Sequence, residues 1–511
     1  MNVSSRARPI AGVARLCIIE ALGLGWTIGL AFCTAVLFVL YTLGLPVPMA
    51  TGAALLCTAI ALGFGLRRLG LVRRADNWDV SPESWACEKS LARRRSGIIW
   101  GRGTLAALLA RSRFNAGTGK MPAPPGLLCA NEKSHIGLAE RLAIPIGLGL
   151  GLLQVVLSAW MAWRSPLAAF DAWSVWAFKA RMFVLGGPRP GYFHDRITLH
   201  THPDYPLNLP LAEAIIWRAA GAWGPQLASL IGPLCLAALL LLFYAGLSRL
   251  HGHTTAALAT AALALIPALP LQAAGGDADV PLALYCGGAA LYLLLWWRLR
   301  RPADAVIMAL LAGGAAWTKK EGLTVAVVLL LAYLGGEALR RGPAMTRRLR
   351  QVAPVVAAWA ALPLPWLIFM LLTHPLGRDF LPTTPAVFLT HVGRLAYIVP
   401  TVALQMLDLA NWSMLWVLLV ALLALSLRRL GAPGYGLLLL LLAQLGAYAL
   451  AFVFSDWRPY TAHVQTALSR LLVQAAPLAL LLLVECAATL MTAQSRARQA
   501  RSVRTREAVV G

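Results

Sequence analysis

The sequence contains few charged residues. Only 13% of its 511 residues are Asp, Glu, Lys or Arg, whereas 59% are hydrophobic. Soluble proteins carry about 25% charged residues, and no soluble fold has an interior large enough to bury so much hydrocarbon. The composition therefore excludes an ordinary soluble protein and indicates a chain that crosses a lipid bilayer many times.

Acidic residues are the scarcer of the two charged kinds, with 21 Asp and Glu against 45 Lys and Arg, which gives a formal net charge of +24. A soluble protein this basic would suggest nucleic acid as a partner. Here the basic residues lie mainly in short connectors between apolar runs, as expected when Lys and Arg are retained on the cytoplasmic side of a membrane. We therefore expect a lipid bilayer, and no nucleic acid, as a partner.

The eight cysteines include no Cys-x-x-Cys pair. Six lie in apolar runs, and Cys87 and Cys129 lie in a long basic segment. These spacings predict neither a disulfide framework nor a zinc site. The apolar run from about 16 to 45 is too long for a signal-peptide core, so we expect it to remain as a membrane anchor.

The apolar runs predict an all-α, polytopic transmembrane helical bundle. Four regions are expected: two N-terminal transmembrane helices (1–66), a basic cytoplasmic loop (67–141), a transmembrane core (142–491) and a basic cytoplasmic tail (492–511). About twelve spans are expected, near 16–42, 47–66, 142–163, 225–247, 254–274, 280–298, 304–318, 323–339, 353–373, 412–428, 434–455 and 470–491.

The charge of the connectors predicts the orientation. With an even number of spans, both termini and the basic connectors are cytoplasmic. The other connectors, which hold most of the reactive side chains, then share the opposite face. Residues 164–223 are expected to form interfacial helices on that face. Residues 376–411 fit either an outer loop with an interfacial helix or an additional span near 396–411, and the basic Arg428-Arg429 connector favours the outer loop.

Asp171 is the first candidate catalytic residue. It lies just beyond a predicted span, between Phe170 and Trp173, with Trp176 nearby. Partly apolar surroundings would raise the pKa of its carboxyl and suit a general base. The alternative is a solvated Asp beside ordinary interfacial Trp residues.

Two further constellations contain carboxylates. His200, His202 and Asp204 alternate along a Pro-rich segment, where they could bind a metal, donate to a phosphate or simply form a turn. Asp277 and Asp279 precede a predicted span. One of them is explained by helix capping, and the Asp-x-Asp spacing is a weak signal for a metal.

Two constellations contain cations on the expected outer face. In Thr318-Lys319-Lys320-Glu321-Gly322, a Lys that opposes the topological bias is explained either by a lipid phosphate or by snorkelling to the headgroups. Arg470 and Gln474 share one face of the last predicted span, where the pair either binds phosphate or anchors the helix at the interface.

Together these motifs resemble the polytopic GT-C glycosyltransferases, which include the protein O-mannosyltransferases and the lipid A aminoarabinose transferases. The resemblance covers roughly 142–490 and follows the family order: Asp171, Tyr205-Pro206-Leu207, Asp279-Val280-Pro281-Leu282, Thr318 to Gly322, and His463 with Arg470-Leu471-Leu472 and Pro477. The chain departs from the family in having Tyr-Pro-Leu-Asn in place of Tyr-Pro-Pro-Leu, and it has no large domain after the last span.

The resemblance implies a membrane glycosyltransferase with an extracytoplasmic site in the cell (inner or plasma) membrane. A sugar would pass, with inversion, from a polyprenyl-phosphate donor to a glycan, lipid or protein acceptor. Asp171 would be the general base, Asp279 would organise the site, and a cofactor is not defined beyond a weak signal for a divalent metal. The candidate substrate-binding residues are Trp173, Lys179, His202, Tyr205, Lys319, Glu321, His463 and Arg470.

The alternative from another class is a transporter or flippase for a polyprenyl-linked glycan, and a third is an inactive scaffold with the same fold. Transporters show internal repeats and helices broken at mid-membrane. The sequence shows no convincing repeat, and its ionisable residues gather at span ends, which favours an enzyme.

Overall fold

The computed structural model describes residues 18–68, 138–186, 190–221, 223–340, 345–377 and 379–510. The chain divides into two units, one formed by Met1–Val72 with Leu142–Gly511 and the other by Arg73–Arg141. Apart from the start of one helix, all described residues belong to the first unit. The predicted cytoplasmic loop at 67–141 falls almost wholly outside the described residues.

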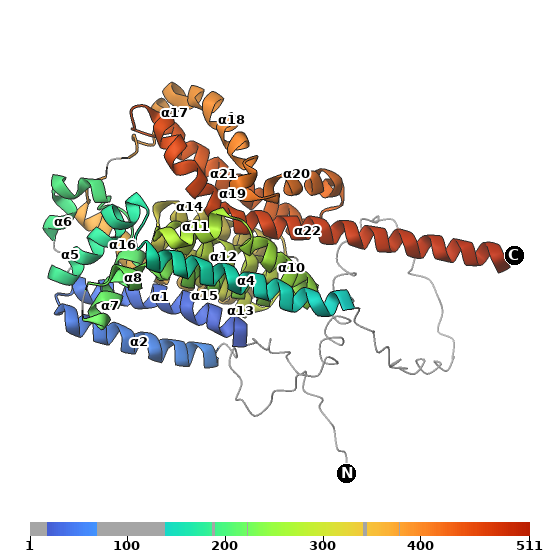
Figure 1. Ribbon diagram of the computed structural model, residues 1–511, viewed down its shortest axis with the longest axis horizontal. Coiled ribbons are helices and arrows are strands. Elements are labelled where there is room, and N and C mark those ends of the chain that lie inside the picture. The colour runs from blue at the N-terminus through green and yellow to red at the C-terminus, as the bar shows by residue number, and fades with distance from the viewer. Residues whose placement is uncertain are drawn as a thin grey trace, which may run out of the picture. The chain divides into compact units, whose positions relative to one another are not determined.

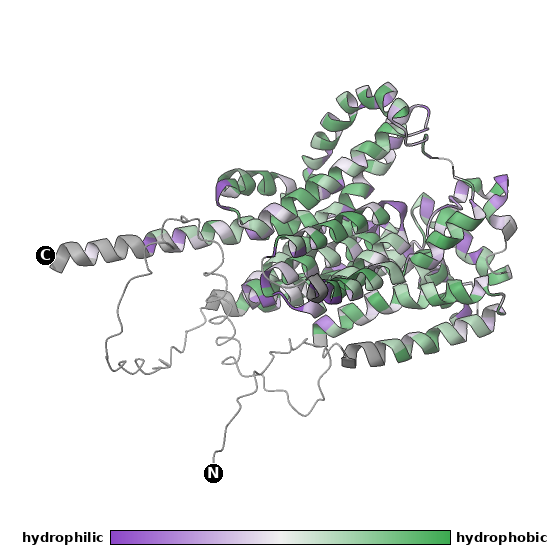
Figure 2. Ribbon diagram, turned by 180° about the vertical axis from the view of Figure 1, so that it is seen from behind, coloured by the Kyte–Doolittle hydropathy of each residue, from purple (hydrophilic) through white to green (hydrophobic). Residues whose placement is uncertain are grey.

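The described part of the chain is helical, apart from one antiparallel bridge between Phe380 and Ser455. Figure 1 shows the arrangement of the helices, and Figure 2 shows that hydrophobic residues dominate them. The all-α architecture predicted from the sequence is therefore confirmed. The helices before residue 225 are α1 (Ile18–Thr42), α2 (Val47–Arg68), α4 (Leu138–Arg164), the π-helix η2 (Ala172–Ala177), α5 (Phe178–Gly186), α6 (Pro190–His194), the 3₁₀-helix η3 (Arg196–Thr201) and α7 (Asn208–Ala220).

The remaining helices complete the bundle. Those up to residue 373 are α8 (Pro225–Ser229), α9 (Ile231–His251), α10 (His253–Ala264), α11 (Ala268–Gly275), α12 (Asp279–Leu299), α13 (Pro302–Thr318), α14 (Lys320–Ala338), α15 (Met345–Ala361) and α16 (Leu364–Thr373). They are followed by α17 (Pro385–His391), η4 (Val392–Arg394), α18 (Leu395–Met406), α19 (Leu409–Trp412), α20 (Leu415–Ser426), η5 (Leu427–Arg429), α21 (Ala432–Val453) and α22 (Tyr460–Val510).

Eight of the described helical segments are long and apolar enough to cross a membrane, and two bent helix pairs raise the number to ten. The polytopic architecture is thus confirmed, with fewer long spans than the twelve expected. The predicted spans at 47–66 and 304–318 contain shorter apolar helices, Pro48–Ala61 and Pro302–Thr318. A helix of 14 to 17 residues is about 21–26 Å long, which is less than a typical hydrocarbon core.

The segment left ambiguous in the sequence, 376–411, contains Pro385–Met406, which is long enough to span. Its first part lies beside the end of α21, because Arg394 donates to the carbonyl oxygens of Val453 and Ser455. Farther along, Ser413 donates to the carbonyl of Leu265, at the break between α10 and α11. The predicted span at 412–428 corresponds to the 12-residue α20, which packs against α22.

Helix α12 is the centre of the bundle. In its spanning window, 94% of the residues are buried, and α9, α13 and α22 pack around it. The N-terminal α1, which the sequence places before the core, packs directly against α9. It is also bonded to the core, because Tyr285 on α12 donates to the Thr27 carbonyl over 2.9 Å.

Buried ion pairs join the ends of these helices on the side of the basic connectors. Arg249 at the end of α9 binds Glu20 on α1 and Asp304 on α13, at 2.9 and 2.8 Å. Glu485 on α22 pairs with Arg298 and contacts His251 at 3.1 Å. Some of the Arg residues of the basic connectors therefore hold the bundle together.

Candidate functional site

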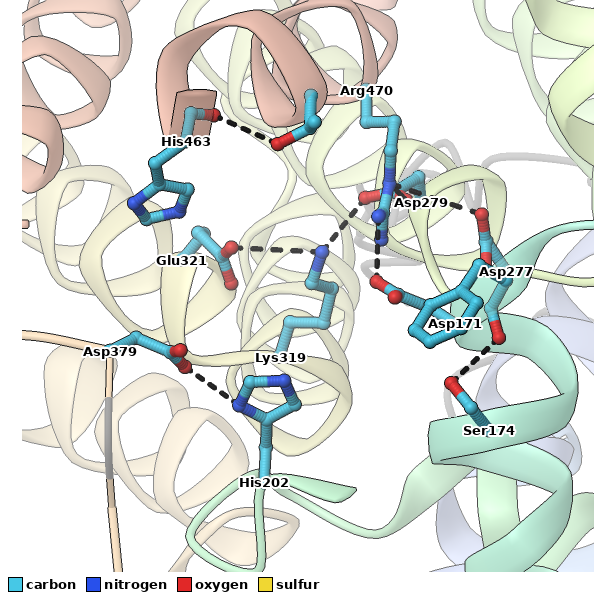
Figure 3. Close-up of polar contacts among 12 residues, drawn as sticks. Asp171, Ser174, His202, Asp277, Asp279, Lys319, Glu321, Asp379, His463 and Arg470 are labelled. Carbon is cyan, nitrogen blue, oxygen red and sulfur yellow. Dashed lines mark hydrogen bonds and ion pairs between the residues drawn. The ribbon is translucent and has the colours of Figure 1, made fainter. Parts of the chain in front are cut away.

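At the opposite end of α12, Asp279 is the hub of a polar cluster (Figure 3). Its carboxylate is fully buried and accepts three hydrogen bonds: from Lys319 Nζ at 2.8 Å, from Arg470 Nε at 2.7 Å and from Gln474 Nε2 at 2.7 Å. Asp279 opens α12, where a negative charge is stabilised by the helix dipole. It thereby ties α12 to α22 and to the junction of α13 and α14.

Arg470 joins Asp279 to Asp171. Its Nη1 donates to Asp171 Oδ2 at 2.6 Å, and its Nε lies 3.9 Å from Asp277 Oδ2. The side chain of Asp171 is 29% exposed and that of Arg470 is 22% exposed, whereas that of Asp279 is not exposed. Of the two predicted catalytic carboxylates, a ligand can therefore reach Asp171 but not Asp279.

Asp171 immediately precedes the π-helix η2. Single turns of π-helix often occur at functional sites, and this one is a signal that sequence periodicity does not reveal. The two Trp rings expected to flank Asp171 diverge. Trp173 is exposed and meets Phe170 edge to face, whereas Trp176 is buried and lies under Lys179. The immediate partner of Asp171 is a cation, Arg470.

Lys319 lies in the extended residue between α13 and α14, where it faces both Asp279 and Glu321 (Figure 3). Burial alone would lower the pKa of Lys319, but these two carboxylates outweigh it and the net direction is upward. The tight turn depends on Gly322, where a Cβ atom would lie 2.0 Å from the carbonyl oxygen of Ala315.

The cluster contains more negative than positive groups. Burial raises the pKa of Asp277 above that of an ordinary Asp; Arg470 opposes this shift, and the charges of Asp279 and Asp171 add to it. Protonation of Asp277 brings the cluster closer to neutrality. The carboxylates are Asp171, Asp277, Asp279 and Glu321, and the cations are Lys319 and Arg470.

Tyr205 lies between two lysines next to this cluster. Lys179 Nζ is 5.7 Å and Lys320 Nζ is 5.0 Å from the ring centroid, both within cation–π range. Lys179 is fully buried and donates to the carbonyl of His202 at 2.7 Å, and Lys320 pairs with Asp204. Lys179 therefore supports the loop from inside, while the part-exposed Lys320, which sequence reasoning did not select, faces outward.

The alternating His200, His202 and Asp204 do not converge on one point. His200 contacts the carbonyl of Ile197, His202 contacts Asp379, and Asp204 pairs with Lys320. Within the described ranges, no group of three His, Cys, Asp or Glu side chains is arranged to hold a metal ion. The described residues therefore give no support to the metal-site alternative for this segment.

His463 is near the cluster but is held by other groups. Its Nδ1 lies 2.8 Å from Ser455 Oγ, and its ring stacks on Trp457 at 4.7 Å. Gln474 continues the cluster inward, because it accepts a hydrogen bond from Tyr448, which is itself bonded to Gln444.

An apolar cavity of about 310 Å³ lies away from the charged cluster, between α4 and the break of α10 and α11. Its lining includes Leu157, Trp160, Pro270 and Leu271, with Gln154 and Ser158 as the polar members. Its chemistry suits hydrocarbon rather than a reacting polar group.

The structure thus gathers Asp171, Asp279, Lys319, Glu321 and Arg470 into one network, with Tyr205, His202, Lys179 and His463 around it. Lys320 was part of the constellation from Thr318 to Gly322 but was not among the candidate site residues, and sequence spacing does not predict the partners of Asp379 or the inward chain through Tyr448. No family model, curated protein or solved structure matches the chain.

Proposed function

We propose that the protein is an inverting membrane glycosyltransferase that uses a polyprenyl-phosphate-linked sugar. The observation that carries the proposal is the convergence of Asp171, Asp279, Lys319 and Arg470, from distant parts of the chain, at one end of α12. An accessible carboxylate beside a part-exposed arginine supplies both a base and a phosphate ligand.

In the proposed reaction, the hydroxyl oxygen of the acceptor attacks the anomeric carbon of the donor sugar. The proton of that hydroxyl passes to Asp171. The bond from the anomeric carbon to the phosphate oxygen breaks, and its electron pair remains on the phosphate oxygen. The products are the glycosylated acceptor, with inverted configuration, and a polyprenyl phosphate monoester.

The contacts assign different tasks to the two aspartates. Asp279 is a positioning residue, because it is buried and fixes Arg470 and Lys319. Arg470 is the accessible cation for the donor phosphate. Because Arg470 also binds Asp171, a phosphate arriving at Arg470 would compete for the guanidinium and release the carboxylate to act as a base.

The position of the cluster fits a lipid-linked donor. Asp279 and Arg298 lie at opposite ends of α12, about 30 Å apart along the helix at 1.5 Å per residue. This is close to the thickness of a bilayer's hydrocarbon core. We propose that the cluster faces the extracytoplasmic side of the cell membrane, because the basic connectors gather at the other end.

The proposal is tested with purified protein in lipid nanodiscs and a panel of polyprenyl-phosphate sugars, with release of polyprenyl phosphate as the readout. Asp171→Asn should abolish release while the protein stays folded. Asp408→Asn is the matched control, since Asp408 caps the distant α19 and Asn is an equally good cap. Wild-type rates in Asp171→Asn would refute the mechanism.

One observation favours the transporter alternative. The α10–α11 and α15–α16 pairs are bent by 59° and 56°, with Pro267 and Pro363 at the breaks, and broken helices are frequent in transporters. However, the residues at these breaks are apolar, and the ionisable cluster lies at helix ends. Movement of a polyprenyl-linked glycan across a proteoliposome membrane, without release of polyprenyl phosphate, would favour the transporter.

A further inference from the structure

His202 and Asp379 form a pair that sequence spacing does not predict. His202 Nδ1 lies 2.7 Å from Asp379 Oδ2, although the residues are far apart in the chain (Figure 3). Asp379 is 7% exposed and His202 is 20% exposed. A buried carboxylate on Nδ1 keeps a proton on that nitrogen, so the other nitrogen, Nε2, exchanges protons with its surroundings.

Both members of the pair are held rigidly. The His202 backbone is left-handed, with φ at 52°, and its carbonyl accepts from Lys179 Nζ and from the Tyr205 amide. Its ring packs on Tyr205 at 4.8 Å. Asp379 is fixed from the other side, since its carbonyl accepts from the Asp456 amide at 2.9 Å.

The free side of the ring belongs to the candidate site. In Figure 3, Nε2 is turned away from Asp379, toward the part of the site that holds Lys319 and Glu321. Among the described residues, no hydrogen bond to Nε2 is formed. The charged and titratable groups around the pair are Lys179 on α5, Asp204 and Tyr205 in the loop, Lys320 and Glu321 on α14, and His463 and Arg470 on α22.

We infer that His202 is a second acid–base residue of this site, and that its Nε2 gives a proton to an oxygen of a bound phosphate group, with Asp379 as its positioning residue. The inference rests on the proposed function. As the bond from the anomeric carbon to the phosphate oxygen breaks, that oxygen takes the proton from the imidazolium, and the neutral ring is reprotonated by water. Asp171 receives the acceptor proton on the other side of the reaction.

The hydrogen bond has the physical effect that this role requires. Burial would raise the pKa of the Asp379 carboxyl, but the hydrogen bond and charge of His202 outweigh burial and lower it. The contact with Asp379 also orients the His202 ring, so that Nε2 is the nitrogen presented to a ligand.

The test is nitrogen-15 NMR of the protein in nanodiscs with labelled histidine. His202 is assigned among the nine histidines from the signal that disappears in His202→Gln. The expected neutral form carries its proton on Nδ1. In Asp379→Asn, this preference for a proton on Nδ1 should weaken, because the carboxylate beside that nitrogen is gone. A neutral form protonated on Nε2 in the wild type, or an unchanged tautomer in Asp379→Asn, overturns the inference.

Farnesyl phosphate and inorganic phosphate then serve as probes of the ligand. The nitrogen-15 signal of His202 Nε2 should shift when either probe binds, and the larger shift identifies a lipid or a free phosphate as the preferred source. No shift of this signal with either probe overturns the assigned role. His200→Gln is the matched control, because His200 is exposed and is turned toward Ile197. If these results hold while no sugar is transferred, the glycosyltransferase proposal fails and phosphate recognition by His202 stands.

If His202→Gln does not fold, the signal is assigned from its shift in Asp379→Asn. If neither variant folds, the wild-type protein still decides the question. The histidine signal that responds to phosphate is then assigned to His202, and the inference stands only if the neutral form of that histidine carries its proton on Nδ1.

Discussion

Replacing Asp279 by Asn should destabilise the folded protein strongly. The carboxylate accepts hydrogen bonds from Lys319, Arg470 and Gln474, and it is completely buried. Removing one partner of a buried ion pair costs about 3–5 kcal/mol, because the remaining charge stays desolvated without compensation.

For Asp279→Asn, we expect a loss of stability at the low end of this range. Arg470 keeps Asp171 as a partner, and Lys319 keeps Glu321 at 3.6 Å. A loss of about 3 kcal/mol corresponds to a decrease of roughly 150-fold in the folding equilibrium constant. The measurement is unfolding in SDS and mixed micelles, followed by tryptophan fluorescence, with Asp408→Asn as the control.

A double-mutant cycle separates the ion pair from other effects of the substitution. Adding Lys319→Met to Asp279→Asn removes the stranded ammonium, so the double variant should be more stable than the sum of the single losses indicates, with a coupling of about 0.5–3 kcal/mol. If Asp279→Asn unfolds within about 0.5 kcal/mol of the wild type, as surface substitutions do, the hub assignment is refuted.

Three further predictions concern the surroundings of this hub. Gly322→Ala should sharply reduce the yield of folded protein, because the added Cβ would clash with the carbonyl oxygen of Ala315. Gly335→Ala is the control and should be tolerated, because Gly335 has open space around it. The yield of folded protein in detergent, measured by size-exclusion chromatography, tests both variants. Asp277→Asn should stabilise the protein relative to the wild type increasingly between about pH 4 and about pH 7, and by a constant amount above that. The reason is that the raised pKa of Asp277 makes the unfolded state release its proton first, so wild-type stability falls as pH rises through this window. A pH-independent difference in SDS unfolding would contradict this. Asn208→Ala should lower the free energy of unfolding in SDS by about 1–3 kcal/mol, because Asn208 is buried and its side chain is hydrogen-bonded to side chains of three other helices. An unchanged unfolding midpoint would show that these hydrogen bonds contribute nothing to stability.

Much of the architecture followed from composition and charge. An apolar run of 20 residues or more can form few structures other than a transmembrane helix, so most long spans were predicted close to their observed positions. The short or broken helices were harder, because hydropathy averages over a window and does not register a bend at Pro267 or Pro363. Residues 376–411 fitted both an outer loop, which the basic Arg428-Arg429 connector favoured, and an additional span, and the structure has there a helical segment, Pro385–Met406, that is long enough to span.

The members of the site were easier to predict than their partners. Asp171, Asp279, Lys319 and Arg470 were conspicuous because charges are rare in such a chain. Their geometry depends on packing: which carboxylate is accessible, and which cation it meets, cannot be read from spacing. The His202–Asp379 contact joins segments whose register depends on the whole bundle, so a single sequence contains no signal for it.

Helix α22 contains 51 residues and is continuous from Tyr460 to Val510, which corresponds to a length of about 75 Å. Arg470 lies on it at the site, and Glu485, about 22 Å farther along the helix, is clamped by Arg298 and His251 near the other end of the bundle. A helix that is held at two points along its length can neither slide nor rotate at one point without straining the contacts at the other. Any movement of Arg470 on ligand binding is therefore mechanically linked to the contacts of Glu485, near the opposite surface of the protein, from which the rest of α22 extends.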